Sequence, residues 1–267
     1  MTRGQAHWSK SIEHTINALM AELRTRDGEL RPPLDLRQIQ ERFRIISVEA
    51  RPMIPEAAIH PTTGGFKVYL QNNFMDLPGT SFRQRFTLAH EFCHTLFYDC
   101  STDPPKRLRG TPSAEKIEFL CHKGAGHLLV PAPLLESEIS RLGDKVVAND
   151  IPALSKKFEV SVEVILRRLQ ESGPSMIDHA IILVEPSPEV SQFHICGAYY
   201  GPWILSYLEP PKYGIQFDQW LNRVSGVKTH RPHKGFQVPV AGATLVISDP
   251  VFTAQHKFLL DISLAPN

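Results

Sequence analysis

Apolar residues near the start of the chain recur at steps of three and four, which is the spacing of one face of an α-helix. This stripe predicts a first helix whose buried face consists of Ile12, Ile16, Leu19, Met20 and Leu23. The polar stretch RDGELRPP interrupts the pattern. Asp35 is then the expected N-cap of a short second helix that reaches Phe43.

From Ile45 onward the pattern becomes strand-like, and RIISVEA and GGFKVYL predict two strands of a small sheet. A long helix with many apolar residues follows and contains FTLAHEFCHTLF. Thr111 and Pro112 predict the start of the next helix, because threonine suits the cap and proline the first turn. That helix turns Ile117, Cys121, Gly124 and Leu128 toward a core and stops at Pro131.

The remainder of the chain changes from short helices to strands. Two short helices joined at Glu159 and Val160 have helix-turn-helix proportions. After the linker ESGPSMID, segments such as HAIILVE, ATLVIS and KFLLDIS predict a mostly antiparallel sheet. We therefore predict an α+β fold in three parts: a mostly helical domain with a small sheet at 1–131, a helix-turn-helix-like helical segment at 132–172, and a C-terminal α+β domain at 175–267.

The amino-acid composition and charge limit the kinds of molecule that the protein is expected to bind. The 267 residues carry a formal net charge of +1, so no overall basic field points to nucleic acid or to a membrane surface. Lys156, Lys157, Arg167 and Arg168 offer charge for DNA contact, but packing onto the first domain is the favoured role of their segment. No apolar run has membrane-spanning length, and the first residues lack a signal-peptide pattern. Four cysteines without a CxxC pair indicate thiols in a cytoplasmic protein.

Candidate chemistry is concentrated in the pentad His90-Glu91-Phe92-Cys93-His94. Helical residues four apart lie on one face, so His90 and His94 can direct two imidazoles at one ion. Zinc favours such nitrogen ligands, and Glu91 can take a proton from a water molecule beside it. The alternative is a buried helix that spells HExxH by chance. Because unpaired polar groups are costly in an apolar environment, a metal ion is the better explanation.

A catalytic zinc site needs a third protein ligand, which we expect on the following helix. Glu118 and His122 are four residues apart on the same face, and spacing alone does not separate them. Cys93 and Cys121 lie close to the ligands in sequence, either as oxidisable thiols or, as we favour, as small buried apolar groups. Tyr98 is expected on the ligand side of the first helix, where it would contact substrate or pack against the next loop.

The runs RQRFTLAHEFCH and EKIEFLCHKGAGHLLVP resemble the ImmA/IrrE family of bacterial metallopeptidases. In that family an R-F-T-x-A-H-E-x-x-H helix precedes a second helix that ends near a proline. The resemblance covers about residues 35–131. It implies that Glu118, thirteen residues before Pro131, is the third ligand. His122 falls where asparagine is common, and Cys93 falls where glycine is common.

The resemblance also implies a function and a fold. The expected protein is a zincin-like, HExxH-containing zinc endopeptidase that uses Zn²⁺, or Mn²⁺, and cleaves a helix-turn-helix repressor of the XRE type to switch on stress and DNA-damage responses. The three-part layout is most similar to the IrrE branch, in which the last domain is a GAF-like sensor. The competing hypothesis is a non-catalytic zinc-binding regulator or scaffold, against which the intact Glu91 argues.

Overall fold

The structure is a computed structural model. In it the chain forms two compact units. Unit 1 comprises Met1–Leu134 with Lys157–Ser161, and unit 2 comprises Leu135–Lys156 with Val162–Asn267. The residues that the structure describes are 11–22, 30–72, 81–143, 146–172, 179–186, 193–200, 219, 236–240, 243–247, 250–253 and 257–266.

The first described segment of unit 1 is helical over residues 11–22, as the apolar stripe predicts. Ile12, Ile16, Leu19 and Met20 are buried, whereas the predicted Leu23 lies outside the described residues. Helix α2 (Leu36–Ile39) begins after Asp35, whose side chain accepts a hydrogen bond of 2.9 Å from the backbone N–H of Arg37. The predicted N-cap is therefore confirmed.

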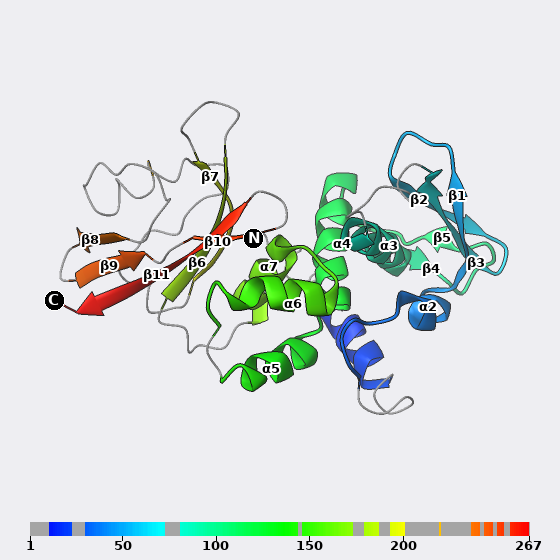
Figure 1. Cartoon of the computed structure of the whole chain (residues 1–267). Helices are drawn as coiled ribbons and strands as arrows, with labels where there is room; N and C mark the ends of the chain where they lie inside the picture. Colours follow the sequence, from blue (N-terminus) through cyan, green and yellow to red (C-terminus); the bar gives the residue numbers. More distant parts are fainter. Residues whose placement is uncertain are drawn as a thin grey trace. The chain divides into compact units, whose positions relative to one another are not determined.

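Three strands form the small sheet of unit 1: β1 (Ile45–Arg51), β2 (Ala57–Thr62) and β3 (Gly65–Gln71), in the order β1-β3-β2 (Figure 1). Strand β3 pairs in parallel with β1 and antiparallel with β2. The alternating residues Phe66, Val68 and Leu70 are buried, which confirms that pattern. Strand β2 was not predicted, because its sequence AAIHPT contains a proline and shows no clear alternation.

The pentad lies at the end of helix α3 (Ser81–His94), which packs against β2 and against helix α4 (Ala114–Leu129) (Figure 1). Helix α4 begins after Ser113, whose carbonyl accepts from the N–H of Ile117 at 2.9 Å. The predicted start at Thr111 and Pro112 is therefore two residues too early. Between α3 and α4 lie the 3₁₀ turn Thr95–Phe97 and a two-stranded ribbon of β4 (Tyr98–Asp99) and β5 (Lys106–Arg107).

Helices α3 and α4 approach closely at Cys93 and Gly124. A Cβ atom added to Gly124 would lie 2.8 Å from the Cys93 Sγ and 3.2 Å from the Ile12 Cγ2. Real Cβ contacts are longer than the first of these distances, so a side chain at this position would push the helices apart. The small residue lets α4 lie against the pentad helix, and Glu118 belongs to the same helix.

The predicted short helices after Pro131 are present as α5 (Ala132–Arg141), α6 (Asp150–Phe158) and α7 (Val162–Ser172). Glu159 joins α6 to α7 in a left-handed conformation, with φ of 53°. Helix α7 packs against the C-terminal sheet, and Arg168 is buried and paired with Glu171 at 2.7 Å. The expectation that Arg168 offers charge to DNA is therefore wrong, because its side chain is buried and its guanidinium is paired with Glu171.

The C-terminal sheet has the order β7-β6-β11-β9-β8, with β10 beside β11, and every described pairing in it is antiparallel. The α+β class and the antiparallel sheet are thus confirmed. The boundaries at 131 and 172 and the GAF-like assignment stay predictions. The strands are β6 (His179–Pro186), β7 (Phe193–Tyr200), β8 (Phe236–Val240), β9 (Ala243–Ile247), β10 (Val251–Phe252) and β11 (Phe258–Pro266).

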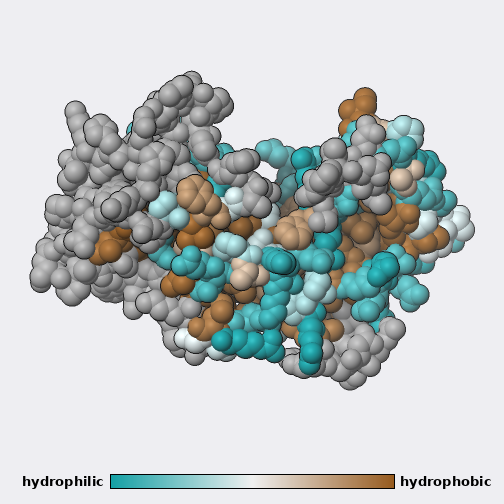
Figure 2. All heavy atoms as spheres, viewed as in Figure 1, coloured by the Kyte–Doolittle hydropathy of each residue, from teal (hydrophilic) through white to brown (hydrophobic). Residues whose placement is uncertain are grey.

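Polar residues cover much of the described surface on the face that Figure 2 shows, with hydrophobic residues visible between them. Within the described ranges, no helix combines the length and the apolar character that crossing a membrane requires.

Candidate metal centre

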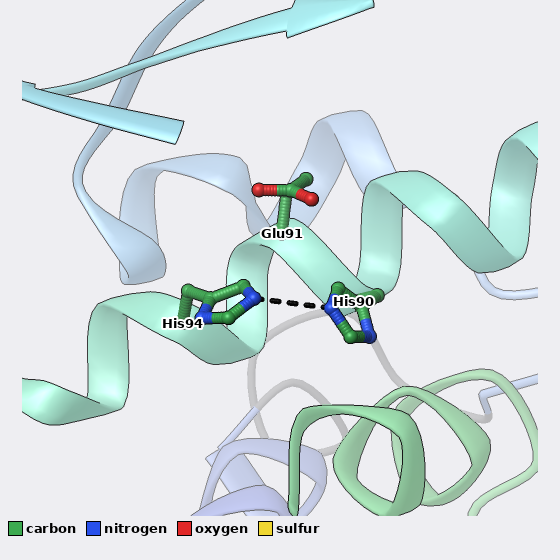
Figure 3. Close-up of side chains that lie close together, drawn as sticks. All are labelled: His90, Glu91 and His94. Carbon is green, nitrogen blue, oxygen red and sulfur yellow. Dashed lines mark hydrogen bonds between the residues drawn. The ribbon is translucent and has the colours of Figure 1, made fainter. Parts of the chain in front are cut away.

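Packing of the apolar side of α3 fixes the direction of its polar side. Ala89, Phe92 and Phe97 are buried, and the Phe92 ring lies 5.4 Å from the Phe43 ring. His90 and His94 leave the helix one turn apart, and Figure 3 shows the two imidazoles facing each other. The helical spacing predicted for the pair is present in the structure.

Three of the predicted metal-binding side chains meet at one point. The Nε2 atoms of His90 and His94 lie 3.0 Å apart. The Glu118 carboxylate reaches both rings, with Oε2 at 3.1 Å from the His90 Nε2 and Oε1 at 3.5 Å from the His94 Nε2. Helix α3 supplies the two histidines and helix α4 supplies Glu118, and the three donor groups lie 3.0–3.5 Å from one another.

These distances match the requirement of a zinc ion. Four ligands placed tetrahedrally at about 2.0–2.1 Å from zinc lie about 3.3 Å from one another. Two neutral imidazole nitrogens 3.0 Å apart can share only one proton, and a carboxylate adds only acceptor oxygens. A cation at their centre satisfies all three groups at once. The residues present therefore fit a site of two histidines and one carboxylate.

Burial controls the protonation of this cluster. It lowers the pKa of His90 and His94, and the neighbouring imidazoles add to the effect at His90, so both rings are neutral near pH 7, the form that can bind a metal ion. Glu91 is only 7% exposed. Its burial, with a smaller contribution from the Glu118 charge, raises the pKa of its carboxyl to about 7. A ligand atom of Glu91 lies within 4.8 Å of those of His90 and His94.

His122 lies beside the same cluster. A ring nitrogen of His122 is within 4.8 Å of the ligand atoms of His90 and Glu118. The His122 ring stands edge-on to the His90 ring at 4.5 Å, and its Nδ1 is 2.9 Å from the backbone carbonyl of Glu118. The structure therefore brings both candidates for the third ligand to the site. Glu118 is the one whose side chain contacts both histidines.

The two cysteines have the properties of packing residues. Cys93 and Cys121 are fully buried, and both are free thiols. Burial raises the pKa of Cys93 to about 12 and shifts that of Cys121 upward as well. Because the thiolate is the reactive form, these values support the apolar role that the sequence favours.

Tyr98 does not lie on the helix where its spacing from His94 placed it. Helix α3 ends at His94, and Tyr98 is extended in β4, with its ring edge-on to Phe66 at 5.1 Å. The expected position on the ligand side of the helix is wrong, because the helix gives way to a 3₁₀ turn before Tyr98. The tyrosine packs on the sheet of unit 1.

Arg107 is a neighbour of the site that sequence reasoning missed. It pairs with Tyr98 across the β4–β5 ribbon, and its guanidinium lies 5.7 Å from the centre of the Tyr98 ring. Its positive charge is among the causes that lower the pKa of His94. The position follows from ribbon pairing over a polar loop, and no motif in the sequence marks it.

Comparison with known proteins agrees with this geometry. Residues 79–170 match the peptidase M78 family, described as the IrrE N-terminal-like domain. This part of the chain is similar to an IrrE N-terminal-like domain. The matched range includes the pentad and Glu118, and it confirms the resemblance to the ImmA/IrrE family that the two helix sequences carry.

The IrrE-like domain has two curated relatives among its matches. One is the radiation response metalloprotease IrrE of Deinococcus deserti, 33% identical over 102 residues, which are 37% of this chain and 36% of the relative. The other is the radiation response metalloprotease IrrE of Deinococcus radiodurans, 32% identical over 102 residues, which are 37% of this chain and 30% of the relative. The chain thus matches about a third of the length of these relatives.

A solved structure described as a Mycobacterium tuberculosis transcriptional regulator is similar over 93% of this chain and 87% of that chain. The sequence identity is 15% and the TM-score is 0.45.

Proposed function

We propose that the chain is a zinc-dependent endopeptidase with its active site in the IrrE-like domain. The observation that carries the proposal is the convergence of His90, His94 and Glu118 to mutual distances of 3.0–3.5 Å. The buried Glu91 stands beside them. A purely structural metal site has no use for a carboxyl group in that position.

Each residue has a separate role in this proposal. His90, His94 and Glu118 would hold the ion, and three protein ligands would leave a position for water or substrate. When bound, zinc acts as a Lewis acid toward the peptide carbonyl and lowers the pKa of water. Glu91 takes a proton from the attacking water and passes it to the departing amine. The buried Glu91 carboxyl, which is 7% exposed and lies beside the two histidines, is placed to make both transfers.

The substrate in this proposal is a helix-turn-helix repressor, whose cleavage releases stress-response genes. The resemblance to the ImmA/IrrE family supports it, as does the radiation response named for both Deinococcus relatives. The same resemblance supports a GAF-like sensory role for the C-terminal sheet and a cytoplasmic location. The donor set favours Zn²⁺ over Mn²⁺, because imidazole suits zinc and manganese prefers oxygen ligands.

A comparison of the parent protein with Glu91→Gln tests the proposal. Each would be co-expressed with a candidate helix-turn-helix repressor from the same organism, and metal content and repressor fragments would be measured by mass spectrometry. Loss of a general base typically costs about 10²–10⁴-fold in rate, so we expect cleavage to fall by this factor. Zinc content should stay at one ion per chain, because Glu91 is not among the three ligands.

His94→Ala provides the second variant, and it should lose both the ion and the cleavage. The mechanism is wrong if Glu91→Gln cuts the repressor as fast as the parent does. A parent protein that holds zinc and binds the repressor without cutting it would instead favour the non-catalytic scaffold.

A further inference from the structure

We propose that His122 is a fourth protein ligand of the metal ion and that it closes the coordination shell when no substrate is present. The proposal rests on the metal site of the proposed function and concerns a residue outside the three ligands already assigned. It applies to this chain in particular, because a third histidine of the cluster follows Glu118 by one helical turn.

The first support is position. Glu118 and His122 lie on the same face of α4, and the ligand atoms of His90, Glu118 and His122 are all within 4.8 Å of one another. Ligands of one tetrahedral zinc ion lie about 3.3 Å apart. A His122 nitrogen therefore needs to come at most about 1.5 Å closer to the His90 and Glu118 atoms to reach that spacing to them. Its side chain is exposed, so rotation of the imidazole displaces no core residue.

The second support is the proton position on the His122 ring. A carbonyl oxygen can only accept a hydrogen bond, so the 2.9 Å contact with the Glu118 carbonyl places the proton on Nδ1. In the neutral imidazole, Nε2 then keeps its lone pair. Ligand histidines in proteins almost always donate their other ring N–H in this way, which fixes the tautomer and the ring orientation. His122 thus already has the hydrogen bond of a metal ligand.

A fourth protein ligand has a clear consequence. Four protein ligands are the mark of a closed zinc site, whereas a catalytic site keeps one position open. His122 therefore competes with water and substrate for that position, and it slows the loss of zinc while the protein waits for a substrate. The contact between the His122 and His90 rings, at 4.5 Å, keeps the competing imidazole beside the opening.

His122→Asn tests this role with little disturbance of the fold. The asparagine amide can still donate to the Glu118 carbonyl, but no nitrogen lone pair remains where Nε2 stood. His60→Asn is the matched control, because it also removes one exposed imidazole from unit 1 and lies on β2, outside the cluster. Full-length zinc-bound protein would be used for all three forms, and their melting temperatures would be compared first.

Two readouts decide the question. Zinc release to an excess of chelator should be more than threefold faster in His122→Asn than in the parent and unchanged in His60→Asn. X-ray absorption at the zinc edge should show one imidazole fewer around the ion in His122→Asn. A threefold or smaller change in release, or an equal number of imidazoles in both proteins, overturns the proposal.

The outcome is separable from the fate of the proposed function. Parent protein that binds zinc without cleaving a repressor refutes the peptidase proposal, yet the release rates still decide the role of His122. Parent protein that binds no zinc refutes both proposals.

Discussion

Replacing Gly124 with alanine should destabilise unit 1 and weaken metal binding, and removing the Cys93 sulfur should reverse the effect on stability. The reason is the close approach of α3 and α4, where the new methyl group would lie 2.8 Å from the Cys93 Sγ. Cys93 is completely buried between the two helices' packed side chains, so its sulfur cannot turn out to solvent to make room for the methyl group. The helices must separate, and Glu118 moves with α4 away from the histidines of α3.

The magnitude follows from two opposing contributions. Overpacking a filled core costs about 1–3 kcal/mol, and alanine in place of glycine within a helix gains about 1 kcal/mol. Gly124→Ala should therefore lower the free energy of unfolding by about 1 kcal/mol in the parent background. In a Cys93→Ala background the overpacking is relieved, and the same change should raise stability by about 1 kcal/mol. The 3.2 Å contact with the Ile12 Cγ2 involves the end of a side chain that can give slightly.

Urea unfolding of the four proteins in a chelator measures this coupling, which should be about 2 kcal/mol. Competition with a zinc indicator then measures affinity, and Gly124→Ala should bind zinc more weakly than the double variant. An equal effect of Gly124→Ala on stability in both backgrounds would refute the packing argument. Equal zinc affinity in all four proteins would show that the helix separation does not control the position of Glu118.

Three further predictions concern single residues. Glu118→Ala should weaken zinc affinity by at least tenfold in an indicator competition, whereas Glu115→Ala, in the first turn of the same helix, should leave it unchanged. In metal-free protein, the Glu91 pKa of about 7 exceeds its ordinary value of 4.5, so this carboxyl binds more protons in the fold than in the unfolded chain between these values, and its contribution to stability is lost as pH rises. The lowered pKa values of His90 and His94 act in the opposite direction in both proteins, so the comparison with Glu91→Gln isolates the Glu91 contribution of about 3 kcal/mol, and an equal change in the urea midpoint between pH 4.5 and 7.5 in both proteins would contradict it. Asp35→Ala removes the N-cap of α2 and should cost about 0.5–2 kcal/mol in thermal unfolding, while an unchanged midpoint would show that the cap contributes nothing.

Local patterns predicted the elements of unit 1 well where the pattern was regular. The helix at 11–22 and strand β3 follow directly from their apolar periodicity, because each buries one face. Predictions failed where local preference was weak. Strand β2 was missed because pairing with β3 stabilises it without an alternating sequence, and α4 began later than Thr111 because several residues before it can cap a helix.

The residues of the candidate site also differ in how far the sequence could predict their arrangement. His90, Glu91 and His94 belong to one helix, whose regular geometry allowed their arrangement to be predicted. The choice between Glu118 and His122 required the spatial relation of α3 and α4, and the structure shows both beside His90. Arg107 had no signal at all, because only the pairing of β4 with β5 brings it near His94.

The amino-acid sequence by itself determined the α+β class, the pair of histidines with the intervening glutamate, and the candidates for a third ligand. These features depend on interactions between residues close along the chain, and helical and strand periodicity describe such interactions directly. Only the tertiary structure decided the depth at which Glu91 is buried, the enclosure of Arg168 and the departure of Tyr98 from the helix. Those outcomes depend on contacts between distant segments, whose packing distances no local pattern encodes.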